Sequence, residues 1–70
     1  MKIEIIETCD VIKWDNIGEY YDGFTPTIET YHKGDVIDCD SLSMTDNKFI
    51  LSDGCLISFD GPESYRMVEM

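Results

Sequence analysis

The stretch "KFILSDGCLISFDG", Lys48 to Gly61, places an Asp-Gly pair between two short apolar runs. Asp-Gly in such a context favours a β-hairpin with a two-residue type I′ turn. The register that follows sets Leu51 opposite Leu56 and Ile50 opposite Ile57 across the two strands. This hairpin therefore decides which side chains share a face of the sheet.

Both faces of the expected hairpin are apolar, because side chains alternate along a strand. One face carries Ile50, Cys55, Ile57 and Phe59, and the other carries Phe49, Leu51 and Leu56. A single solvated sheet does not tolerate that exposure. We therefore expect a second layer over the far face, a strongly curled sheet or a partner chain. The aromatic segment 15–26 is the best internal candidate for the cover.

Short apolar and β-branched runs predict strands along the rest of the chain, at 2–6, 27–31, 36–39 and 65–70. The run 9–14 is either a second strand or the first strand continued past a bend. Segments 15–26 and 40–47 are predicted loops, and no segment has a helical stripe. Turn signals recur roughly every 8 to 12 residues. The chain, residues 1–70, is thus predicted to be a single all-β domain, a small SH3-like or open barrel of five to six short antiparallel strands.

The charge balance is strongly acidic: 15 Asp and Glu oppose 5 Lys and Arg, for a net charge of −10. A field of this sign repels phosphate backbones and anionic lipids. We therefore expect no direct nucleic-acid or membrane partner, and a basic protein surface or a cation instead. The acids are spread along the chain rather than gathered in a tail. They either serve solubility or form a functional negative surface.

The cysteines, Cys9, Cys39 and Cys55, are odd in number and show no CxxC spacing. The first residues, "MKIEIIETCD", do not resemble a signal peptide. Reduced thiols and a cytoplasmic location are the expectation. No apolar run approaches the roughly 20 residues that a membrane span needs.

The segment "DCDSLSMTD" resembles a calcium loop at its first, third and ninth positions, which are Asp38, Asp40 and Asp46. The pattern then fails where an oxygen ligand, a glycine and a bidentate glutamate are required, at Leu42, Ser43 and Phe49. One histidine and three scattered cysteines also lack zinc-ligand spacing. We predict no metal site.

Catalytic patterns are missing as well. No serine or cysteine lies in a nucleophile elbow, and His32, beside the "KGD" turn, is read as a solvated residue. The Asp-Gly pairs lack the spacing of phosphate-binding loops. We expect no catalytic residue, no cofactor and no enzymatic activity.

Carboxylates on a rigid sheet can imitate a row of phosphates and pair with the Arg and Lys of a nucleic-acid-binding protein. The candidates lie around the C-terminal hairpin: Asp38, Asp40, Asp46, Asp53, Asp60 and Glu63. A second set of candidates is aromatic: Trp14, Tyr20, Tyr21 and Phe24. These aromatic residues either fold back as a lid over the core or form an exposed contact patch.

The second half of the chain, from Tyr31 to Met70, resembles small bacteriophage-encoded β proteins. The resemblance lies in an aromatic before "KGD", a short strand, an Asp-Gly hairpin and an aromatic final strand, here Tyr31, Lys33-Gly34-Asp35, Val36-Ile37, Asp53-Gly54, Tyr65 and Val68-Glu69. It implies an SH3-like barrel and a viral origin. Small acidic phage proteins often inhibit host enzymes, including restriction and CRISPR systems.

The first functional hypothesis is therefore a non-enzymatic inhibitor that occludes a basic, nucleic-acid-binding site on a host protein such as a defence nuclease. If the chain is viral, the host cytoplasm is its location. The alternative is a structural or accessory subunit. It would form homo-oligomers or dock through the apolar second face of the hairpin.

Overall fold

The computed structural model describes residues 1–45 and 47–68, and of residues 41–45 it describes the backbone alone. It confirms a nearly all-β fold, with seven antiparallel strands in one unclosed sheet where five or six were expected. The elements are β1 (Lys2–Ile5), β2 (Cys9–Trp14), α1 (Ile17–Tyr21), β3 (Thr27–Tyr31), β4 (Val36–Thr45), β5 (Lys48–Leu51), β6 (Leu56–Ser58), the 3-10 helix η1 (Pro62–Ser64) and β7 (Tyr65–Val68).

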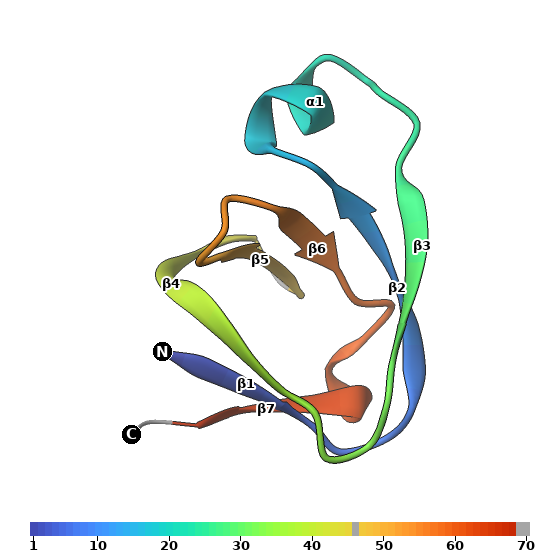
Figure 1. Ribbon diagram of the computed structural model, residues 1–70, viewed down its shortest axis with the longest axis vertical. Coiled ribbons are helices and arrows are strands. Elements are labelled where there is room, and N and C mark those ends of the chain that lie inside the picture. The colour runs from blue at the N-terminus through green and yellow to red at the C-terminus, as the bar shows by residue number, and fades with distance from the viewer. Residues whose placement is uncertain (46, 69–70) are drawn as a thin grey trace.

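The sheet has the order β3-β2-β6-β5-β4-β1-β7 and is curled around its own interior (Figure 1). In that view β4 lies on one side, β2 and β3 lie on the other, and β1 and β7 cross below. The inward side chains form one core: Ile3, Ile5, Val11, Tyr31, Cys39, Phe49, Leu51, Ile57 and Phe59. Curling thus removes one apolar face of the hairpin from water without a second sheet.

The outer face of the hairpin is also covered. Leu56 is fully buried, although it precedes the core residue Ile57 in β6 and therefore points to the opposite side. It lies directly opposite Trp14, the last residue of β2, which is only 8% exposed. The chain after Trp14 continues into α1, which lies beyond the end of β2 (Figure 1). Curling, one of the expected solutions, is therefore combined with an aromatic residue against Leu56, but this residue is Trp14 of β2 and not part of the segment 15–26 that was the expected cover.

The predicted register of the hairpin is wrong by one residue. The structure pairs Phe49 with Ile57 and Ile50 with Leu56, and the N–H of Leu51 donates to the carbonyl of Cys55 at 2.7 Å. The connection is a three-residue loop in which Gly54, at φ 93°, takes the left-handed conformation after a tight turn. Asp-Gly is compatible with this geometry as well as with the two-residue turn. Phe49, Leu51 and Ile57 consequently all face the core.

Two predicted loops contain regular structure. The segment 15–26 includes α1, and most of the segment 40–47 belongs to β4, which runs to Thr45. β4 stays paired with β5 through register shifts between Cys39 and Ser43 and between Ser43 and Thr45. Such bulges let a polar stretch continue in a ladder, because backbone hydrogen bonds do not depend on side-chain hydropathy. Polar composition was therefore a poor indicator of a loop here.

Shortening Leu56 to alanine should lower the free energy of unfolding by about 2 to 5 kcal/mol, the usual cost of a cavity at a buried leucine. Ile28→Ala is the matched control, because Ile28 lies in β3 and is 73% exposed. It should cost no more than about 0.5 kcal/mol. Urea unfolding of both variants measures the difference. Equal, small losses would show that the outer face of β6 is not covered.

Candidate functional site

The short helix α1 begins with a side-chain cap. The amide oxygen of Asn16 accepts a hydrogen bond from the backbone N–H of Glu19 at 2.9 Å. The carboxylate of Glu19 in turn accepts one from the N–H of Asp15 at 3.4 Å. An Asn followed three residues later by Glu is a known signature of a helix start. That signature was the signal in the sequence that could have predicted this helix.

The helix ends at a glycine. Gly23 has φ 79°, its N–H donates to the carbonyl of Tyr20, and the N–H of Phe24 donates to the carbonyl of Glu19. This pair of bonds is the Schellman arrangement, which requires a left-handed residue and favours glycine. The carbonyl of Phe24 then accepts a hydrogen bond from the indole Nε1 of Trp14 at 3.0 Å. The segment after β2 is thus held to the sheet at both of its ends.

The structure brings the predicted aromatic residues into one neighbourhood. The rings of Trp14 and Tyr20 meet edge to face at 5.0 Å, and those of Tyr20 and Tyr21 at 5.4 Å. Trp14 is buried and Tyr20 half-buried, whereas Tyr21 is 71% and Phe24 55% exposed. The lid and the contact patch that were posed as alternatives therefore coexist: Trp14 and Tyr20 cover the sheet, and Tyr21 and Phe24 face solvent.

Carboxylates are close in sequence to these exposed aromatics. Residues 15–24 contain Asp15, Glu19 and Asp22 and no lysine or arginine. Asp15 and Asp22 are exposed, and Glu19 is partly exposed. None of the three is among the predicted acidic contact residues, which were the ones around the C-terminal hairpin. We call Asp15, Glu19, Tyr21, Asp22 and Phe24 the α1 patch.

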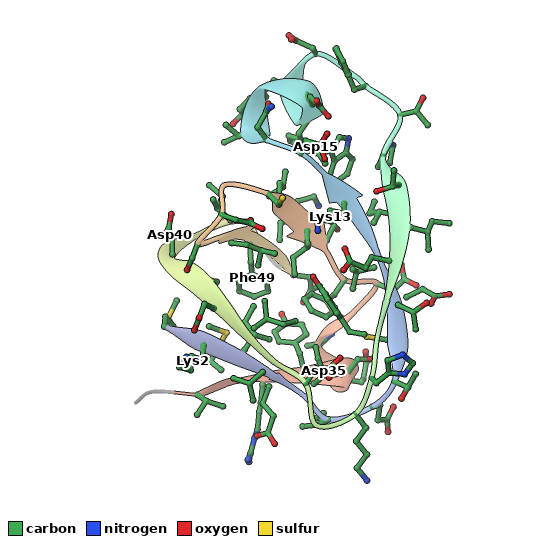
Figure 2. All side chains as sticks on the ribbon, viewed as in Figure 1. Lys2, Lys13, Asp15, Asp35, Asp40 and Phe49 are labelled. Carbon is green, nitrogen blue, oxygen red and sulfur yellow. The ribbon has the colours of Figure 1, made fainter. Side chains whose placement is uncertain are left out.

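The predicted acidic row around the C-terminal hairpin is dispersed. Asp38 and Asp40 lie on the outer side of β4, Asp53 lies in the β5–β6 turn, and Asp60 and Glu63 belong to the connection from β6 to β7. All five are exposed, and Asp46 lies outside the described residues. The labelled carboxylates of Asp15, Asp35 and Asp40 lie at three different sides of the molecule (Figure 2). The acids therefore coat the fold rather than follow one line.

The outer face of β4, β1 and β7 carries charges of both signs. Lys2 forms an ion pair with Asp38, and this hydrogen bond holds the pKa of the carboxyl below its ordinary value. On the neighbouring pair, the guanidinium of Arg66 contacts the carboxylate of Glu4 at 2.6 Å. Alternating charge of this kind does not resemble a phosphate row.

A cleft of about 410 Å³ opens where β3 and β4 diverge. It is lined by Lys13, Glu29, Tyr31, Val36, Ile37, Asp38, Leu51, Ser52 and Asp53. The ammonium group of Lys13 lies 2.9 Å from the carboxylate of Glu29, and this bond raises the pKa of the lysine against the opposing effect of burial. The volume falls in the range of small-ligand sites. Of the predicted contact residues that the structure describes, Asp38 and Asp53 alone border this cleft.

Sequence reasoning missed the cleft, although the parity of the strands contained the signal. Lys13 shares an inward face with Val11, and Glu29 shares one with Tyr31. Alternation therefore places one charged pair on the concave side of the sheet. The alternation of side chains along a strand does not, however, predict that β3 and β4 separate at this position.

The thiols offer no activated nucleophile. All three cysteines are free, and burial is the main cause that raises the pKa of each. A raised pKa reduces the fraction of reactive thiolate. Among the described residues no group of three His, Cys, Asp or Glu side chains could hold a metal ion. No helix in the described part of the chain combines the length and hydropathy of a membrane span.

Comparison of this chain with protein-family models, with curated proteins and with solved structures finds no match. The fold and the chemistry of these two surfaces, the α1 patch and the cleft, are therefore the observations on which a function is argued.

The stability of the fold should fall as pH rises from about 10 to about 12, in part because of Tyr31. Burial raises the pKa of this phenol from its ordinary 10.0 to about 12, and the Glu29 carboxylate adds to the effect. Between these values the folded chain holds a proton that the unfolded chain has lost, so unfolding becomes easier as pH rises. Urea unfolding across this range measures the slope.

Tyr31→Phe is the control, because it keeps the ring and removes the titrating group. The variant should show a shallower loss of stability over the same range. An unchanged slope would show that Tyr31 titrates alike in the folded and unfolded chain.

Proposed function

We propose that this protein is a non-enzymatic acidic binding protein that docks on a cationic surface of another protein through the α1 patch. The observation that carries the proposal is the exposure of Tyr21 and Phe24 among carboxylates, on a segment with no cation of its own. Exposed aromatic side chains that lie together are a frequent feature of protein-binding surfaces. The same short segment carries Asp15, Glu19 and Asp22, whose charge a basic partner would neutralise.

The chemistry of the patch suits arginine and lysine. A guanidinium or ammonium group is attracted to the face of an aromatic ring and to a neighbouring carboxylate. Among the described residues, the ion pairs engage Lys2, Lys13 and Arg66 with carboxylates elsewhere on the fold. The α1 patch contains no such internal neutralisation, and the net charge of −10 adds long-range attraction for a basic partner.

The patch is also preorganised. The capped start at Asn16, the glycine stop at Gly23 and the bond from Trp14 to the carbonyl of Phe24 fix the backbone that presents it. An ordered segment loses less conformational entropy on binding than a free loop does. Rigid aromatic anchors of this kind are common among the residues that dominate binding energy.

More specifically, we propose that this binding inhibits the partner protein. A chain that covers a nucleic-acid-binding surface of a host protein, such as a defence nuclease, would compete with the phosphate backbone by charge and by volume. A cytoplasmic location accords with free thiols. Because the carboxylates around the hairpin do not form one row, we assign the contact to the α1 patch rather than to a phosphate-like series.

The alternative, self-association through the apolar face of the hairpin, has less surface to use. Phe49, Leu51, Leu56 and Ile57 are each at most 6% exposed in the single chain. A second copy would also bring together two surfaces with the same excess of negative charge. We therefore favour a cationic partner over a homo-oligomer.

The double variant Tyr21→Ala/Phe24→Ala should lose most of its binding to cationic proteins captured from a bacterial lysate. Each truncated anchor at the centre of an interface removes about 2 kcal/mol or more. Quantitative mass spectrometry compares the captured proteins for the wild type and the variant at low and high salt. Charge pairing predicts basic captured proteins and weaker capture at high salt.

Ile28→Ala is the matched control, because it removes an exposed apolar side chain away from the patch. It should capture the same proteins as the wild type. Capture that is indifferent to salt, or that survives in the double variant, would exclude the α1 patch as the binding surface.

A further inference from the structure

The cleft between β3 and β4 contains a polar group that nothing in the described chain satisfies. Tyr31 lines the cleft and is 9% exposed, so nine-tenths of it is buried. Its hydroxyl makes no hydrogen bond to any described residue. No fully buried side-chain oxygen or nitrogen lacks a partner in the described part of the chain, so this hydroxyl is open to the cleft. A phenol at this depth normally has a hydrogen-bond partner, so this hydroxyl offers a ligand in the cleft a position that no described residue fills.

The charges around that hydroxyl favour a cation. Glu29, Asp38 and Asp53 are among the residues that line the cleft, and Lys13 is the one cation of that lining, but the Asp38 side chain points to the outer face of β4. Asp38 is paired with Lys2 on the outer face, whereas Asp53 makes no ion pair with a described residue. Asp53 does accept a hydrogen bond from the N–H of Cys55 at 3.0 Å, which fixes the direction of its carboxyl. An anionic ligand would have to displace Glu29 from Lys13, whereas a cation meets an unneutralised carboxylate.

The rest of the lining is apolar. Ile37 and Leu51, on the inward face of β4 and β5, supply aliphatic surface beside the charged groups. Such a surface suits a hydrocarbon stem that ends in a polar head. A bare metal ion does not fit, because the carboxylates of the described residues do not come together as a ligand set. The cation must be extended enough to reach separate acceptors.

We propose that the cleft binds an alkyl-guanidinium group, with its head between the Tyr31 hydroxyl and the Asp53 carboxylate and its stem against Ile37 and Leu51. A guanidinium has five donors in a planar fork and can bridge acceptors that one ammonium cannot. The ammonium position beside Glu29 is already occupied by Lys13. This site is distinct from the α1 patch, and the inference does not rest on the function proposed above.

The guanidinium has two possible sources, an arginine side chain of a partner or a free small molecule. β3 forms one edge of the sheet and provides the Glu29 and Tyr31 side of the cleft. An extended peptide along this edge could place an arginine into the cleft while its backbone pairs with β3. Acetyl-Gly-Arg-Gly-amide and n-butylguanidinium are therefore the two probes.

Titration of isotopically labelled protein with n-butylguanidinium, followed by NMR, tests the site. Amide shifts should concentrate on Tyr31, Val36 and the turn from Leu51 to Asp53. The neutral isostere n-butylurea should bind at least about tenfold more weakly, because it lacks the charge that strengthens each hydrogen bond. Tighter binding of the arginine peptide than of n-butylguanidinium assigns the site to a partner side chain, and equal binding assigns it to a small molecule.

Tyr31→Phe and Asp53→Asn should each weaken binding about tenfold. Both keep the shape of the residue, and asparagine can still accept the bond from Cys55. Asp60→Asn removes an exposed charge outside the cleft and should leave affinity within about twofold at moderate salt. The Tyr21→Ala/Phe24→Ala variant should bind the probes normally, which separates this site from the α1 patch. Equal binding by wild type and both cleft variants, or shifts confined to other regions, would overturn the proposal.

Discussion

The structure depends on one constraint: a single sheet with two apolar faces must bury both within 70 residues. A chain of this length has little material for a second layer. Curling places Phe49, Leu51 and Ile57 inside, where they meet the inward side chains of the other strands. The opposite face, centred on Leu56, is closed by Trp14 at the end of β2. Neither device alone would remove both faces of the hairpin from water.

Both candidate surfaces lie where the curled sheet and the aromatic cover leave side chains exposed. The cover over the outer face is attached through α1 and the segment after it, and these leave Tyr21 and Phe24 exposed. The curl does not close completely, and the gap between β3 and β4 leaves Tyr31 with an open hydroxyl. Burial of apolar side chains accounts for most of the fold. It does not account for the exposed Tyr21 and Phe24 or for the charged cleft, and for that reason we propose a function for the α1 patch and the cleft.

Sequence reasoning predicted the parts that depend on local chemistry. The β-branched run of β3 has the predicted bounds, and the Asp-Gly hairpin exists. It failed where one local signal permits two geometries. Asp53-Gly54 fits a two-residue and a three-residue loop, and only the packing of Phe49 against Phe59 and Tyr65 in the core selects the second. The helix start at Asn16 was readable from its spacing to Glu19, but the exposure of Tyr21 depends on which side of that helix meets the sheet.

Net charge and specificity have separate origins in this molecule. In the function proposed above, the acids around the fold would attract a partner of positive charge and raise the rate of encounter, but acids spread over all sides cannot select an orientation. Lys2 and Arg66 further reduce the contrast on the outer face of β1 and β7, because each neutralises a carboxylate there. The orientation of a bound partner must then come from features that the dispersed acids lack, namely aromatic side chains on a fixed backbone and hydrogen-bond acceptors in a concave site. The α1 patch has the first and the β3–β4 cleft has the second. A cationic partner would therefore be drawn to the whole molecule and held at one of these two surfaces.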